Sequence, residues 1–193
     1  DTYFGKGKKN KLHALDCAGM DPRTATGRML LMMRDVMAQG EIDSTSERFP
    51  DEILVGINDR GERQFHDLYR VNITTGERKL WQENPGFAGF LADDDFRVRF
   101  ALNITPDAGQ ELLKKNGDKW DSFLKIGPLD AMNTSPAGFD KTGEHLYFID
   151  SRERNTAALT SIDLKTGKQT LIAEDPRADI SGALSHPTEK TIQ

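Results

Sequence analysis

Residues 68–85 read LYRVNITTGERKLWQENP, and residues 159–176 read LTSIDLKTGKQTLIAEDP. The second stretch repeats the first at an offset of 91 residues. The identical positions are Leu68, Thr75, Gly76, Leu80, Glu83 and Pro85, which recur as Leu159, Thr166, Gly167, Leu171, Glu174 and Pro176. In each copy an alternating apolar run, a Thr-Gly turn and a second apolar run predict a β-hairpin.

The glycine of each copy has a specific role in this prediction. A tight hairpin turn needs a residue with positive φ, and glycine adopts that conformation without steric cost. We therefore expect positive φ at Gly76 and Gly167. Because a lone hairpin is marginally stable in water, each copy is expected to form the outer half of a four-stranded unit that packs beside others.

The spacing of the apolar strands predicts the fold class. Strands centred near residues 55, 100 and 147 lie about 45 residues apart, the length of a four-stranded β-propeller blade. No long amphipathic helix follows residue 40. We predict an all-β fold, a partial β-propeller of about four four-stranded antiparallel blades. Residues 36–193 form the blades, incomplete at the C-terminus, and residues 1–35 form an irregular N-terminal segment.

Composition excludes several classes of function. A net charge of −5 argues against a nucleic-acid partner, and no apolar run reaches the roughly 18 residues of a membrane span. Cys17 is the single cysteine, so no intramolecular disulfide forms; this fits a reducing compartment such as the cytoplasm without establishing one. The basic stretch at residues 5–11 and Asp93–Asp95 are expected to be solvated turns or loops, and Met29–Met33 is expected to pack in a core.

Several phrases of the sequence resemble a known family. Residues 49–60 read FPDEILVGINDR, and HDLY follows at residues 66–69; SPAGFD, LYFIDSR and NTAAL begin at residues 135, 146 and 155. Together they resemble the propeller of bacterial dipeptidyl-peptidase and acylaminoacyl-peptidase-like members of the prolyl oligopeptidase family. The resemblance covers roughly residues 36–193. It implies a propeller that caps a C-terminal α/β-hydrolase domain carrying Ser, Asp and His.

The chain lacks the catalytic part of that pattern. It contains no Gly-x-Ser-x-Gly motif, so it has no nucleophile elbow. Its histidines, His13, His66, His145 and His186, are expected to be structural or surface residues. No catalytic residue, metal site or cofactor is therefore predicted in this chain, and its place in an enzyme depends on a hydrolase domain that the sequence does not contain.

Three arginines are the candidate substrate contacts. Arg60 and Arg152 hold equivalent repeat positions, and Arg154 lies beside the second. An arginine fork can bind a peptide carboxylate through two hydrogen bonds. The competing interpretation is that these are exposed turn residues that form weak ion pairs.

Two functions are compatible with these observations. The first is the non-catalytic propeller portion of a serine peptidase, acting as scaffold and substrate-size filter for the absent hydrolase domain, with a peptide as substrate. The alternative is a free-standing β-repeat module that binds a protein or peptide and has no enzymatic half. In either case an open propeller leaves unpaired strand edges, so self-association through edge strands is expected.

Overall fold

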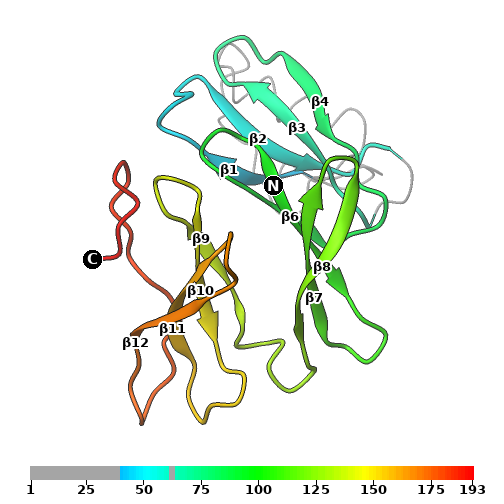
Figure 1. Cartoon of the computed structure of the whole chain (residues 1–193). Helices are drawn as coiled ribbons and strands as arrows, with labels where there is room; N and C mark the ends of the chain where they lie inside the picture. The colour runs from blue at the N-terminus through cyan, green and yellow to red at the C-terminus, as the bar shows by residue number, and fades with distance from the viewer. Residues whose placement is uncertain (1–39, 61–63) are drawn as a thin grey trace, which may run out of the picture. The chain divides into compact units, whose positions relative to one another are not determined.

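The computed structural model describes residues 40–60 and 64–193, and over these ranges it contains strands and no helix (Figure 1). The strands form three four-stranded antiparallel sheets, each pairing neighbours in sequence. The prediction of an all-β chain built from four-stranded antiparallel units is confirmed. By compactness the chain divides into a first unit that ends at Gly89 and a second that spans Phe90–Gln193.

The strands follow one another along the chain. The first sheet contains β1 (Gly40–Thr45), β2 (Glu52–Ile57), β3 (Asp67–Asn72) and β4 (Arg78–Gln82). The second contains β5 (Gly89–Ala92), β6 (Val98–Ile104), β7 (Gln110–Asn116) and β8 (Lys119–Ile126). The third, drawn from yellow to orange in Figure 1, contains β9 (Ser135–Phe139), β10 (His145–Asp150), β11 (Ala158–Asp163) and β12 (Gln169–Ala173).

Two details differ from the sequence-based expectation. The polar stretch that includes GEIDST forms β1, which pairs with β2, although its alternation is too weak to indicate a strand. The apolar alternation around residue 100 extends back to Phe96, which would place the strand start there, but β6 begins at Val98. Phe96 has φ of 58° and is fully buried, so it turns the chain and still contributes its ring to the interior.

Each unit has an apolar interior made by the inward faces of its strands. The cluster of the second unit draws on both of its sheets: Phe100, Leu112, Ile126, Leu146, Phe148, Ile162 and Leu164. The cluster of the first unit comprises Ile53, Val55, Ile57, Tyr69 and Val71. Alternate residues of β2, β6 and β10 supply much of both clusters, as expected for strands that bury one face.

The repeated hairpin turns match atom for atom. Gly76 has φ of 78° and Gly167 has φ of 73°, which confirms the predicted positive φ. The glycine N–H donates to the carbonyl oxygen of Asn72 in one copy and of Asp163 in the other, each at 2.8 Å. The side-chain Oδ1 of Asn72 or Asp163 accepts from the backbone N–H groups of the residues two and three positions later, at 2.8–2.9 Å.

This geometry predicts the effect of removing a turn glycine. Gly167→Val is expected to lower the free energy of unfolding by roughly 1–2 kcal/mol or more, because a β-branched residue resists positive φ. Urea unfolding followed by tryptophan fluorescence measures the change. Gly182→Val is the control, since no atom lies within 4 Å of a Cβ at either glycine but only Gly167 has a positive φ. Equal destabilisation by the two variants would contradict the role of φ.

The connection between the first two strands of each sheet contains a second repeated device. A side-chain acceptor there binds backbone N–H groups two to five residues later, at 2.9–3.4 Å. In the three sheets these acceptors are Ser46, Asp93 and Asp140, and a fourth, His186, lies 46 residues after Asp140 and beyond the third sheet. The fourth precedes Ile192, which forms a bridge with Ser185. Asp93 is buried, so the expectation of a wholly solvated turn at Asp93–Asp95 is wrong: its carboxylate organises the turn.

The connection between the second and third strands is longer in the first and third sheets than in the second sheet, where it comprises residues 105–109. There the chain runs through residues 58–66 and 151–157. These loops carry Arg60, Arg152 and Arg154, the candidate contacts. The turns between the first and second strands, and between the third and fourth, lie at the other end of these strands. Each of these sheets therefore has one end closed by tight turns and one end formed by loops.

The N-terminal segment expected at residues 1–35 lies outside the described residues, together with the basic stretch, Cys17 and Met29–Met33. Among the residues that are described, no helix has the length and apolar character to cross a membrane.

Candidate functional site

A cleft of about 700 Å³ opens at the loop end of the second unit. It lies where the β8–β9 and β10–β11 loops meet β11 and β12. Its lining residues are Lys125, Gly127, Asp130, Asp150, Arg152, Glu153, Arg154, Thr160, Gln169 and Leu171. The cleft therefore brings together two of the three candidate arginines, while Arg60 lies in the first unit.

Arg152 forms a two-bonded ion pair with the aspartate two residues before it. Its Nε donates to Asp150 Oδ1 at 2.8 Å and its Nη2 donates to Oδ2 at 2.7 Å. The same carboxylate accepts from Gln169 Nε2 at 2.6 Å, and Asp150 is only 4% exposed. The guanidinium edge that would bind a peptide carboxylate thus already holds a carboxylate of the chain itself.

Arg154 and Arg60, unlike Arg152, each form an ion pair with an exposed glutamate. Arg154 Nη1 lies 2.6 Å from Glu174 Oε2, and both side chains are about one-third to one-half exposed. Arg60 bonds Asp67 at 2.6 Å and Glu83 at 2.9 Å. Glu83 and Glu174 are repeat positions, so in both sheets a loop arginine bonds the glutamate that follows the fourth strand. Such exposed pairs contribute little to stability, because water and salt screen the two charges.

A second polar cluster also recurs, and the sequence did not indicate it. An aspartate near the end of the second strand bonds a side chain of the fourth strand, and a side chain of the third strand completes the cluster. The members are Asp59, Tyr69 and Arg78 in the first sheet and Asp150, Thr160 and Gln169 in the third. Burial, then the hydrogen bond to Asp59, raises the pKa of Tyr69 to about 12.

The bonds to Asp150 have a consequence for acid stability. Burial alone would raise the pKa of this carboxyl, but hydrogen bonds from Arg152 and Gln169 outweigh burial and hold the pKa below its ordinary value of 3.8. A depressed folded-state pKa stabilises the fold above the unfolded-state pKa, and this stabilisation is lost as pH falls through the folded-state pKa. Asp150 therefore contributes to stability at neutral pH and loses that contribution below pH 3.8.

We expect Asp150→Asn to be less stable than the parent chain at pH 7, since it leaves Arg152 without its carboxylate. The difference between the two proteins should narrow as pH falls below 3.8. Urea unfolding at a series of pH values measures both proteins, and subtracting one curve from the other removes the contributions of other carboxyl groups. Parallel curves across the whole range would contradict the assignment.

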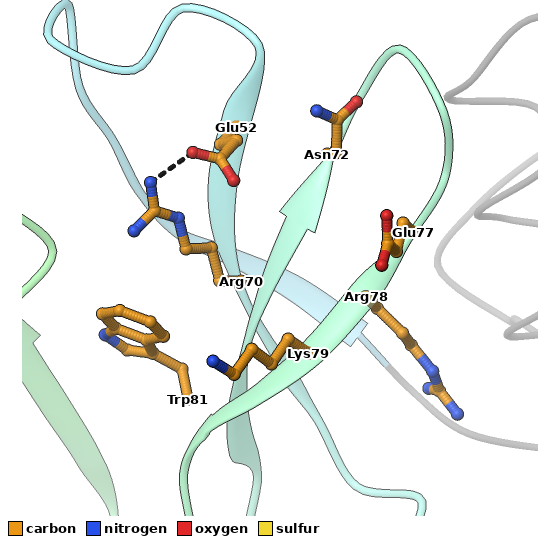
Figure 2. A pocket seen from close by; sticks show the side chains of 7 residues that line it. All are labelled: Glu52, Arg70, Asn72, Glu77, Arg78, Lys79 and Trp81. Atoms are coloured by element: carbon orange, nitrogen blue, oxygen red, sulfur yellow. Dashed lines mark hydrogen bonds and ion pairs between the residues drawn. The ribbon is translucent and has the colours of Figure 1, made fainter.

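A smaller cavity of about 300 Å³ is lined by residues of β2, β3, β4 and the β3–β4 turn of the first sheet (Figure 2). Arg70 points toward Glu52 and forms an ion pair with it. Its guanidinium carbon also lies 4.5 Å from the ring centre of Phe49 and 5.1 Å from that of Trp81. Because these groups hold Arg70 in place, the cavity wall is structural and supports β3 and β4.

The described histidines bond to groups close to loops and turns, and His145 is the first residue of β10. His145 Nδ1 lies 3.4 Å from Asp140 Oδ2, and His186 Nδ1 accepts from the N–H of Glu189 at 3.1 Å. His66 offers its backbone carbonyl to the side chain of Asn84 at 3.0 Å. Within residues 40–60 and 64–193, no three His, Cys, Asp or Glu side chains are placed to bind a metal ion.

Comparisons with known proteins place the chain beside peptidases. No family model matches it. It is 39% identical over 176 residues to dipeptidyl aminopeptidase BIII of Pseudoxanthomonas mexicana, a match that covers 90% of this chain and 25% of that protein. It is 28% identical over 152 residues to dipeptidyl peptidase family member 6 of Caenorhabditis elegans, over 74% of this chain and 20% of that protein.

The chain thus spans a quarter or less of the curated relatives it matches. Among solved structures, TolB from Acinetobacter baumannii superposes with a TM-score of 0.49 and 12% identity, over 72% of this chain and 33% of that chain.

Proposed function

This chain matches the N-terminal portion of a prolyl oligopeptidase-family peptidase, and from that premise we propose that it is the non-catalytic propeller portion of such an enzyme. In this role it acts as a scaffold and substrate-size filter for a hydrolase domain that lies outside the chain. The substrate is a peptide.

The observation that carries the proposal is the extent of the match to dipeptidyl aminopeptidase BIII. It runs through 90% of this chain yet covers only 25% of the relative. The described part of this chain consists of repeated four-stranded sheets, and the whole sequence contains no Gly-x-Ser-x-Gly motif. A chain without an activated nucleophile cannot itself perform covalent peptide hydrolysis by the serine mechanism.

The loop end of the third sheet supports a role beside a peptide. Arg154 is bound to Glu174 across an exposed pair, so an incoming carboxylate can replace that glutamate at small cost. Arg152 is held by the buried Asp150 and serves instead to fix the shape of the cleft. Of the candidate contacts in this cleft, Arg154 is therefore the one suited to exchange partners, and Arg60 is bound to a repeat-equivalent glutamate in the first unit.

A chimera tests the proposal. In it, this chain replaces the matched region of dipeptidyl aminopeptidase BIII. We expect the chimera to release dipeptides from short chromogenic peptides, and the chain alone to hydrolyse neither those peptides nor chromogenic esters. We also expect the chimera to cleave short peptides far faster than long folded proteins, and this preference to weaken when the chain is deleted.

Each part of the proposal can fail separately. Turnover by the chain alone that is abolished by replacing one serine would refute the non-catalytic assignment. A chimera that folds but releases no dipeptide, together with peptide binding by the chain alone, would favour a free-standing binding module. An unchanged size preference after deletion would refute the filter.

A further inference from the structure

The loop that joins β8 to β9, residues 127–134, holds two large apolar side chains in water. Leu129 is 95% exposed and Met132 is 90% exposed. The loop consists of two consecutive turns, in which the Asp130 N–H donates to the Gly127 carbonyl and the Asn133 N–H donates to the Asp130 carbonyl, each at 3.0 Å. The two apolar residues lie three positions apart in these turns.

Buried and part-buried hydrogen bonds link this loop to other residues of the second unit. Ser151 Oγ donates to Asp130 Oδ1 at 2.8 Å, and the Ser151 N–H donates to Thr134 Oγ1 at 3.0 Å. Thr134 is 1% exposed. The side chain of Gln110 adds a bond to the carbonyl of Ala131 at 3.2 Å. These bonds hold the loop backbone from which Leu129 and Met132 project, and less backbone ordering on binding lowers the entropic cost of docking a partner.

A third apolar side chain lies at the same end of the second sheet. Ile104 is 62% exposed, and it pairs across the sheet with Gln110, whose amide reaches the loop. Charged side chains that line the adjoining cleft, Lys125, Glu153 and Arg154, border the loop. An apolar centre beside a charged rim is the usual composition of a protein interface.

We propose that Ile104, Leu129 and Met132, here called the apolar loop surface, are the anchors on which the hydrolase domain docks. The inference rests on the proposed function and identifies the surface through which the two parts meet. Because the match covers only 25% of dipeptidyl aminopeptidase BIII, most of that relative lies outside the matched region and is available to cover this surface.

The size of the surface favours a tethered partner over a second copy of the chain. A free protein partner needs an interface that buries roughly 1,200–2,000 Å² for stable association. A domain on the same polypeptide has an effective concentration near the millimolar range, so a few anchors suffice to hold it. Three apolar side chains at one end of the second sheet match the second case.

Cysteine labelling of the chimera tests the docking surface. Leu129→Cys and Met132→Cys are introduced separately, with Lys165→Cys as the control, and Cys17 is replaced by serine in all three. Lys165 is exposed at the tip of the β11–β12 turn, the end of the third sheet away from the loops. Maleimide reaction is followed by peptide mass mapping, in native buffer and in urea, so each site has its own unprotected reference.

We expect labelling at positions 129 and 132 to be at least tenfold slower in the native chimera than in urea, with little protection at position 165. A chimera that releases dipeptides but labels rapidly at 129 and 132 would overturn the docking surface and leave the proposed function standing. Protection that disappears on dilution, with a halving of mass, would assign the surface to a second copy and also overturn the inference. A folded chimera that releases no dipeptide would instead count against the proposed function, and free labelling in that protein would refute both.

Discussion

Phe100→Ala is expected to lower the free energy of unfolding of the chain by about 3–5 kcal/mol, the usual cost of truncating a fully buried phenylalanine. Phe100 has no exposed surface. Its ring centre lies 5.0 Å from that of Phe123 and 6.2 Å from that of Phe139, so its loss leaves a cavity between strands of both sheets of the second unit. Small domains are stable by only about 5–15 kcal/mol, so the variant should lose a large fraction of its stability.

Urea unfolding of the 193-residue chain, followed by tryptophan fluorescence, measures this effect. Leu129→Ala is the matched control, because its side chain is 95% exposed and surface truncations usually change stability by less than about 0.5 kcal/mol. Similar unfolding midpoints for the two variants would show that Phe100 does not lie in a close-packed core.

Gly109→Ala is expected to lower the free energy of unfolding by about 1–3 kcal/mol, the usual cost of forcing extra volume into a packed site. A Cβ at this position would lie 2.6 Å from the carbonyl oxygen of Ile126 and 2.9 Å from Thr105 Oγ1. The carbonyl belongs to the backbone of β8 and cannot rotate away, so β7 and β8 would have to separate.

The control for this prediction lies one residue after the obstructing carbonyl. Gly127→Ala places its Cβ where no atom lies within 4 Å, and it should leave the unfolding midpoint nearly unchanged. If Gly109→Ala and Gly127→Ala unfold at the same urea concentration, the result would contradict the close approach of the two strands at Gly109.

The parts of the fold that sequence could predict are those with a local cause. Gly76 and Gly167 require no tertiary information, because a tight turn after an alternating run needs positive φ wherever it occurs. Strand β10 could also be predicted, because its residues are mostly apolar. β1 could not be predicted, because its residues are mostly polar and exposed and it becomes a strand only through pairing with β2.

The candidate site divides in the same way. The repeat offset placed Arg60 and Arg152 on equivalent loops, but their partners depend on strand register. Gln169 reaches Asp150 because it lies opposite Ile162 at the start of β12. This contact between the second and fourth strands depends on the registers of two strand pairs together, which the repeat offset does not give. The exposure of Leu129 could not be predicted either. An apolar residue between turn-forming residues is normally expected in the core, and only the structure of the loop shows that this one is exposed.

In the three sheets each strand pairs only with its neighbours in sequence, and this pattern favours folding through local contacts. No hydrogen-bonded pair of strands in the three sheets waits for a distant segment, so every sheet closes through short-range contacts, which form quickly. Hairpins form in about 1–10 μs, whereas a ribosome adds only about 5–20 residues per second. We therefore expect the sheet that begins at Gly40 to form before the next has been synthesised, so that the sheets assemble in their order along the chain.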